Sequence, residues 1–145
     1  MKPIPLLFIP AFALLLTNAP GCGSRPVAAV PVAVIDNNSS TRLAEVAGDT
    51  VEQISQVYPS VQTRFVFDSP PVDPFGAALV RDLRLRGYAI NEGGGDPGGI
   101  ALQFETATVD GQYYLAVHLD GKTLSRIYSD ATGPFEPVSL WAMRE

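Results

Sequence analysis

The chain has 145 residues, of which 46% are hydrophobic, and a formal net charge of -5. Its length supports one domain of about 100 residues besides an apolar N-terminal segment, and its acidic balance argues against a nucleic-acid partner, because phosphate binding needs a basic surface. One cysteine and one histidine provide neither an internal disulfide nor a Cys/His zinc site, so we expect no metal and no cofactor.

Residues 1–21 have the pattern of a signal peptide. Lys2 gives a positive start, and the segment from Ile4 to Leu16 is almost wholly apolar. A helix of this length is shorter than the ~30 Å hydrocarbon layer at ~1.5 Å per residue, and Pro10 would interrupt it. We therefore predict an export signal rather than a permanent transmembrane anchor.

The only cysteine, Cys22, follows this signal directly, and the small residue Gly21 precedes it. This arrangement resembles the bacterial lipobox, in which the cysteine becomes the lipidated N-terminus of the mature protein. Ala19 and Pro20 differ from the residues usual in that motif. The resemblance implies a lipid anchor on Cys22, and Gly23 in place of an aspartate implies the outer membrane, facing the periplasm. The alternative is an ordinary secretory signal with an incidental cysteine.

Residues 22–39 are rich in Pro, Ala, Val and small polar residues without helical periodicity, and we predict a semi-extended tether. Aliphatic stretches lie on both sides of Pro31, although a solvated linker has little need of them. They could add as an edge strand to a neighbouring protein's sheet, which makes Val32, Val34 and Ile35 candidate partner-binding residues. A strand of the protein's own sheet is the alternative.

Residues 40–145 are predicted to form a single α/β domain, which begins with a helix from Ser40 to Tyr58. Ser40 is the expected N-cap and Pro59 ends the helix, while Gly48 weakens its middle. Apolar residues recur at helical spacing and predict a buried stripe: Leu43, Val46, Ala47, Val51, Ile54 and Val57. The acidic residues are expected on the solvent side: Glu45, Asp49 and Glu52.

A short strand and a second helix are predicted next. The strand covers Gln62–Asp68. The helix has Asp73 as its N-cap, Pro74 at its first position and Gly87 at its end. Its predicted buried stripe is Phe75, Ala78, Leu79, Leu83 and Leu85. Because the chain passes through one glycine into a strand at 88–90, this order is typical of an α/β arrangement.

The next segments predict a three-stranded antiparallel meander. Alternating residues cover 100–109, 112–120 and 122–129, and they are separated by Asp-Gly pairs at 110–111 and 120–121, which are strong hairpin signals. We therefore predict an α+β fold, in which two helices pack on a mixed sheet that ends in the meander.

The C-terminal segment is turn-rich up to Pro137, and residues 138–144 are predicted to be a last strand or a wrap across the domain. Trp141 is the only tryptophan of the chain. A large aromatic side chain near a terminus usually docks the end of the chain on the core. We expect Trp141 in the core, with partner contact as the alternative.

No group of residues predicts an enzyme. His118 is the only possible histidine base, and the alternation of its strand places it on the surface. The glycine-rich loop at 91–99 is followed by a strand rather than by the helix that a phosphate cradle needs. The basic residues of the second helix fit a solvated face better than a site for an acidic partner: Arg81, Arg84 and Arg86.

The chain from Phe65 to the C-terminus resembles the TrbH lipoproteins of conjugative transfer systems. The shared features are a Pro-rich stop, Asp73-Pro74-Phe75, Leu83-Arg84-Leu85-Arg86-Gly87-Tyr88, Leu124-Ser125-Arg126-Ile127-Tyr128 and an end that contains Trp141. The resemblance implies a structural, non-enzymatic part of a type IV secretion assembly, which binds other secretion-system core proteins in the periplasm. The element order also looks like the small modules at the N-terminal, periplasmic ends of secretins, which implies a ring of several copies. A periplasmic binding module for a peptide or a cell-wall ligand is the alternative.

Overall fold

The computed structural model describes residues 37–95, 98–129 and 133–145. The predicted signal peptide, the lipid attachment residue Cys22 and the tether residues Val32, Val34 and Ile35 lie outside this part of the chain. None of the helices in the described ranges is long and apolar enough to cross a membrane.

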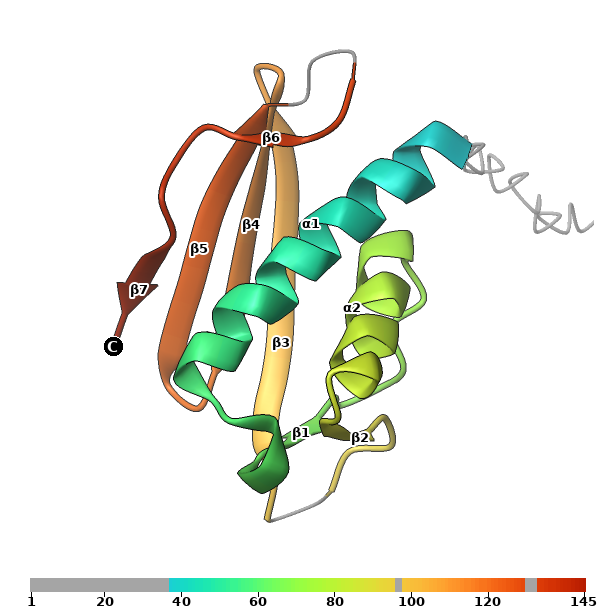
Figure 1. The fold of residues 1–145 in the computed structure, drawn as a ribbon, viewed down its shortest axis with the longest axis vertical. Coiled ribbons are helices and arrows are strands. Elements are labelled where there is room, and N and C mark those ends of the chain that lie inside the picture. The colour runs from blue at the N-terminus through green and yellow to red at the C-terminus, as the bar shows by residue number, and fades with distance from the viewer. Residues whose placement is uncertain (1–36, 96–97, 130–132) are drawn as a thin grey trace, which may run out of the picture. The chain divides into compact units, whose positions relative to one another are not determined.

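The domain consists of two helices on one face of a mixed sheet (Figure 1). The helical elements are α1 (Asn37–Val57), the 3₁₀ turn η1 (Ser60–Gln62) and α2 (Pro74–Leu85). The strands are β1 (Arg64–Val66), β2 (Ala89–Asn91), β3 (Ile100–Val109), β4 (Gln112–Leu119), β5 (Lys122–Ser129), β6 (Glu136–Pro137) and β7 (Ala142–Arg144). This architecture confirms the predicted α+β class with a mixed sheet.

The strand order is β2-β1-β3-β4-β5-β6, and β7 also pairs with β5. β1 lies between β2 and β3 and is parallel to both. All later pairings are antiparallel, so the predicted meander of β3, β4 and β5 is confirmed. At both hairpin turns the Asp and the Gly have positive φ, with Asp110 at 51° and Asp120 at 46°, as a two-residue type I′ turn requires.

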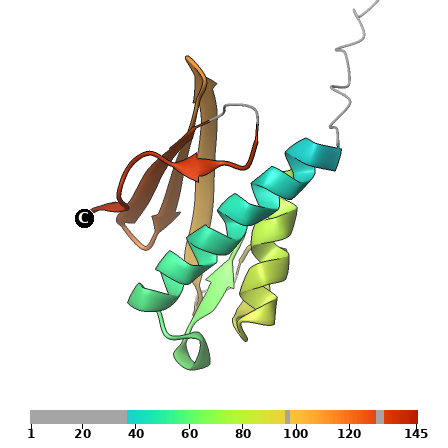
Figure 2. The same ribbon diagram turned by 45° about the horizontal axis from the view of Figure 1, so that its top comes forward.

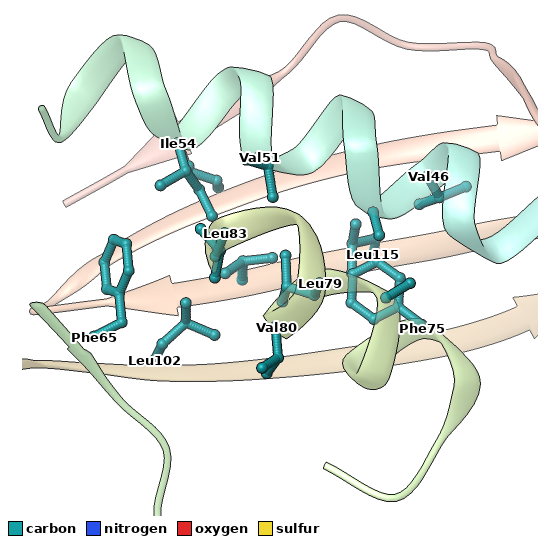
Figure 3. Packing of buried hydrophobic residues seen from close by; sticks show 14 of the residues in the cluster. Val46, Val51, Ile54, Phe65, Phe75, Leu79, Val80, Leu83, Leu102 and Leu115 are labelled. Carbon is teal, nitrogen blue, oxygen red and sulfur yellow. The ribbon is translucent and has the colours of Figure 1, made fainter. Parts of the chain in front are cut away.

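The hydrophobic core fills the space between the helices and the inner face of the sheet. Val51 and Ile54 point from α1 toward Leu79 and Leu83 of α2 (Figure 3), and Val46 of α1 is also buried. The sheet contributes side chains that are at most 2% exposed: Phe65, Leu102, Leu115, Val117, Leu119, Leu124 and Tyr128. The periodicities of the two helices and of β4 therefore correctly predicted which faces are buried.

α1 differs from its prediction at its start and on one face. It begins at Asn37, so Ser40 lies inside the helix and its prediction as the N-cap was wrong. The helix continues through Gly48, whose missing side chain faces Asp82 of α2. Asp49 was expected to face solvent, but it binds two side chains of β5. The crossing of α1 over β5 is a tertiary feature that helical periodicity alone does not contain.

α2 follows its prediction closely. Asp73 is the N-cap and its Oδ1 accepts a hydrogen bond from the Gly76 amide at 2.9 Å. Gly87 has a φ of +89° and ends the helix. Leu85 was expected in the buried stripe, but its side chain is 79% exposed. It occupies the last position of the helix.

The first strand is shorter than predicted, and the chain end forms two short strands. η1 takes up the start of the predicted strand at 62–68, so β1 covers three residues only. β6 pairs with the Tyr128 end of β5, and β7 pairs with its Thr123 end. The C-terminal segment is therefore an edge of the sheet, as one of the two predicted alternatives described.

Candidate interaction surface

The outer face of the meander, opposite the helices, carries a mainly apolar groove. Along β4, Tyr113 and Leu115 point to the core, so Tyr114 and Ala116 point outward. The groove has a volume of about 470 Å³. Its lining includes Ala107, Tyr114, Ala116, Ser125, Ile127 and Leu140. The lining therefore combines small residues with larger apolar side chains.

The C-terminal segment contributes one side of this groove and is held firmly against β5. The Val138 amide donates to the Ile127 carbonyl at 2.9 Å, and the Ile127 amide donates to Ser139 Oγ at 3.0 Å. Leu140 follows directly and is 88% exposed. The strand pairing and these two bonds therefore fix an exposed leucine beside the groove.

On the inner face, a polar cluster connects the same tail to α1. Arg126 Nη1 donates to both carboxylate oxygens of Asp49, at 2.9 and 2.8 Å. Arg126 Nε donates to the Ser139 carbonyl at 3.0 Å, and its guanidinium lies 5.6 Å from the Trp141 ring centroid. The Tyr128 hydroxyl donates to Asp49 at 2.5 Å. The cluster joins helix, strand and tail at one point.

Burial in this cluster raises the pKa of the Tyr128 hydroxyl far above its usual range, and the hydrogen bond to the Asp49 carboxylate adds to the shift. The phenol is therefore neutral over the whole physiological range. A tyrosine that stays protonated and donates to a carboxylate acts here as a structural group that orients Asp49 toward Arg126.

His118 lies on the outer face among ordinary cross-strand neighbours. Its Nδ1 is 3.0 Å from Thr123 Oγ1, the residue opposite it on β5, and its Nε2 is 4.0 Å from Glu105. The imidazole side chain is 39% exposed. Its Nε2 atom is buried without a hydrogen-bond partner among the described residues. The contacts are those of a surface strand residue, as the alternation predicted.

The other predicted polar features have local structural roles. Arg81 pairs with Asp82, and Arg84 pairs with Glu92. The glycine loop leads from Gly99 directly into β3, and the Gly94 amide donates to the Phe67 carbonyl at 3.0 Å. Within 37–95, 98–129 and 133–145, no three His, Cys, Asp or Glu residues come together as a metal site.

Trp141 is the only predicted site residue in the described part of the chain. It is partly buried and packs against the hydrophobic core and Arg126, in agreement with the prediction that it docks on the core. Its contact with a partner stays a prediction. Sequence reasoning missed the groove. The signal was present in the outward positions of β4 and β5, where Tyr114 and Ile127 stand among small residues.

Comparisons with known proteins identify the family. The model of the family described as "Conjugal transfer protein TrbH" matches residues 29–145. Neither a search of curated proteins nor a search of solved structures gives a match. The family match covers most of the chain, including the whole described domain, and it confirms the resemblance that the sequence motifs indicated. The chain therefore belongs to the TrbH family of conjugal transfer proteins.

Proposed function

We propose that this protein is a structural component of a conjugative type IV secretion system. In this proposal a lipid on Cys22 holds it at the outer membrane, and its domain binds other transfer-system proteins in the periplasm. Membership of the TrbH family supports a role in conjugal transfer. The observation that carries the binding role is the apolar groove on the outer face of the meander.

The chemistry of the groove favours a protein partner. Many of its lining residues are apolar or small, and Tyr114 and Leu140 are exposed large side chains among them. Tyrosine and aliphatic side chains among small residues can bury an apolar side chain of a partner, and such burial provides most of the energy of protein contacts. The alternative, a binding module for a peptide or a cell-wall ligand, would use the polar residues of this lining, which include Glu105, Ser125 and Ser139.

A charged side chain at Leu140 tests the groove. Leu140→Glu places a carboxylate beside the groove at a position that is already exposed, so the fold should persist. The matched control is Leu85→Glu, which changes another largely exposed leucine, at the end of α2. We expect the first variant only to lose at least about tenfold in affinity for its partner, which corresponds to about 1.4 kcal/mol, and to transfer DNA less often. Equal transfer by both variants would argue against the groove.

The lipid anchor is tested separately. Metabolic labelling with radioactive palmitate should label the wild-type protein and leave Cys22→Ala unlabelled. Membrane fractionation of the labelled protein should then recover it with the outer membrane. Equal labelling of both proteins, or of neither, would refute the anchor without affecting the groove.

The same proposal includes a relation to the modules at the periplasmic ends of secretins, and with it a ring of several copies. The order α1-β1-α2-β2 followed by the meander supports this relation. Co-purification in mild detergent should recover the protein in a large complex with other transfer proteins. Recovery as a free monomer would argue against the assembly role.

A further inference from the structure

β3 extends well beyond β1, the strand that pairs with it along the edge away from β4. On one side β4 pairs with β3 from Leu102 to Val109. On the other side, among the residues that the structure describes, β1 pairs with β3 only at Ile100 and Ala101. Figure 1 and Figure 2 show β3 as the longest strand, reaching far past β1. The second half of β3 therefore has an edge with which no other described strand pairs, and we call it the free edge.

The length of this free edge is limited at one end. The Gln103 side chain donates to Asp68 Oδ2 at 3.0 Å, so the segment after β1 covers the edge at this level. From Glu105 to Val109 all five residues are exposed, and the hairpin turn at 110–111 follows. A strand of about five residues can pair here, which is the usual length of a short strand.

The hairpin geometry determines which backbone groups are available. In a two-residue hairpin the residues that flank the turn, Val109 and Gln112, exchange hydrogen bonds with each other. Because bonded and non-bonded pairs alternate along an antiparallel ladder, Ala107 also bonds to β4, whereas Thr106 and Thr108 direct their N–H and C=O groups away from it. The free edge therefore presents two donors and two acceptors.

This edge has few of the features that protect other edge strands. Proteins usually blunt a free edge with charged side chains, above all lysine, with proline, with a bulge or with a covering segment. The sequence Glu-Thr-Ala-Thr-Val contains one charge, Glu105, at its start and neither lysine nor proline, and its register with β4 is regular, without a bulge. Threonine and valine also favour strand structure. An edge with this composition is suited to pair with another strand.

We propose that the partner is the β3 edge of a second copy of this chain. The two strands pair antiparallel around a twofold axis at Ala107, so that Ala107 lies opposite the same residue of the other copy. Thr106 then lies opposite Thr108 of the second copy, and Glu105 opposite its Val109. Both threonine pairs exchange backbone bonds, so the pairing adds four hydrogen bonds and satisfies every free group from 105 to 109.

The side chains fit this register from both faces of the joined sheet. On the helix side, threonine faces threonine, which is a favourable cross-strand pair. On the outer side the axis passes through a small residue, and the only charge, Glu105, faces a valine instead of another glutamate. A shift of two residues toward Glu105 would bring the two glutamates nearer to each other, so like-charge repulsion favours the proposed register. Ala107 and Glu105 also line the apolar groove, so pairing would make the outer faces of two copies continuous.

Disulfide cross-linking tests both the contact and its register. The full-length chain carries Cys22→Ser, so that each variant has one introduced thiol. Ala107→Cys should form a covalent dimer on mild oxidation, because opposite residues of a non-bonded pair have Cα atoms about 4.5 Å apart, within disulfide range. Glu105→Cys and Val109→Cys should cross-link when mixed, and at least about tenfold less when each is alone. Glu52→Cys, on the exposed side of α1, is the control for random collision.

The outcomes separate the possible occupants. Dimers of the Ala107 variant together with the mixed-pair pattern support the proposal. Equal cross-linking of all variants, or none above the Glu52 control, refutes it. If the edge instead bound the Val32–Ile35 stretch, Ala107→Cys would cross-link to a cysteine at Ala33 and not to itself, which would also refute the twofold pairing.

A backbone substitution provides a second test that preserves the fold. Thr106→Pro removes an N–H group that points away from β4, and proline is tolerated on the solvent side of an edge strand. We expect Thr106→Pro to reduce the dimer fraction at least fivefold in analytical ultracentrifugation, while Thr106→Val retains it. Unchanged dimerisation with an unchanged circular dichroism spectrum would overturn the proposal. The groove and the lipid anchor are tested by other variants, so these results are independent of the proposed function.

Discussion

Asp49 of α1 and Arg126 of β5 form an ion pair in which one guanidinium nitrogen lies 2.9 and 2.8 Å from the two carboxylate oxygens. The arginine side chain is only 16% exposed and the aspartate side chain 33%. Tyr128, Ser139 and Trp141 complete the surroundings of the pair. The pair therefore connects the helix layer to the strand that carries the C-terminal segment.

Asp49→Asn should destabilise the domain by about 2 kcal/mol, because a largely buried arginine loses its charged partner. The expected loss is below that of a fully buried pair, since a third of the Asp49 side chain is in contact with water. Glu45→Gln removes the same charge from the exposed side of α1 and should change the free energy of unfolding by less than about 0.5 kcal/mol. Urea unfolding of both variants measures the difference, and equal losses would contradict the role of the pair.

The raised pKa of Tyr128 predicts a stability that falls at alkaline pH. The folded state holds the phenolic proton more tightly than the unfolded chain, whose tyrosines ionise near pH ~10. The contribution is complete below that pH and is lost as the pH rises above it. The free energy of unfolding of the wild type, measured from pH 8 to pH ~11, should fall more steeply than that of Tyr128→Phe. Parallel curves would refute this linkage.

Two glycines in the helices should respond to alanine in opposite ways. A Cβ atom at Gly76 would lie 2.4 Å from Pro71 Cβ and 2.7 Å from Phe104 Cζ, so Gly76→Ala should destabilise the domain by about 1–3 kcal/mol. At Gly48 the nearest atom is Asp82 Oδ2 at 4.0 Å. Gly48→Ala should therefore stabilise α1 by up to about 1 kcal/mol, the difference in helix propensity. Thermal unfolding decides both signs, and a stabilised Gly76→Ala would show that the contact is not tight.

The N-cap residue of α2, Asp73, should contribute about 1 kcal/mol to the free energy of unfolding. Asp73→Ala removes the acceptor of the Gly76 amide and should lower the free energy of unfolding by that amount, whereas Asp73→Asn keeps an acceptor and should cost less. The measurement is the midpoint of urea unfolding for the wild type, Asp73→Asn and Asp73→Ala, which should decrease in that order. If the alanine and asparagine variants unfolded at the same midpoint, the hydrogen bond at the cap would not contribute.

Much of this domain could be predicted from sequence because its signals are local. An N-cap residue, a proline at the first helical position and a terminal glycine define α2, and two Asp-Gly turns define the meander. In each case the energy lies between residues only a few positions apart, so the pattern of the chain reports it directly. The apolar run and the cysteine that suggest a lipid anchor are also local patterns.

The tertiary structure decided the features that depend on how distant elements meet. Asp49 does not simply face water, because α1 crosses β5 and brings it to Arg126, which lies 77 residues later in the chain. The free edge of β3 exists because β1 is three residues long and β3 is ten. The groove exists because the C-terminal segment pairs along β5. Helix and strand periods determine which side of an element is apolar, but pairing length and crossing are set by packing between remote segments, which no local pattern contains.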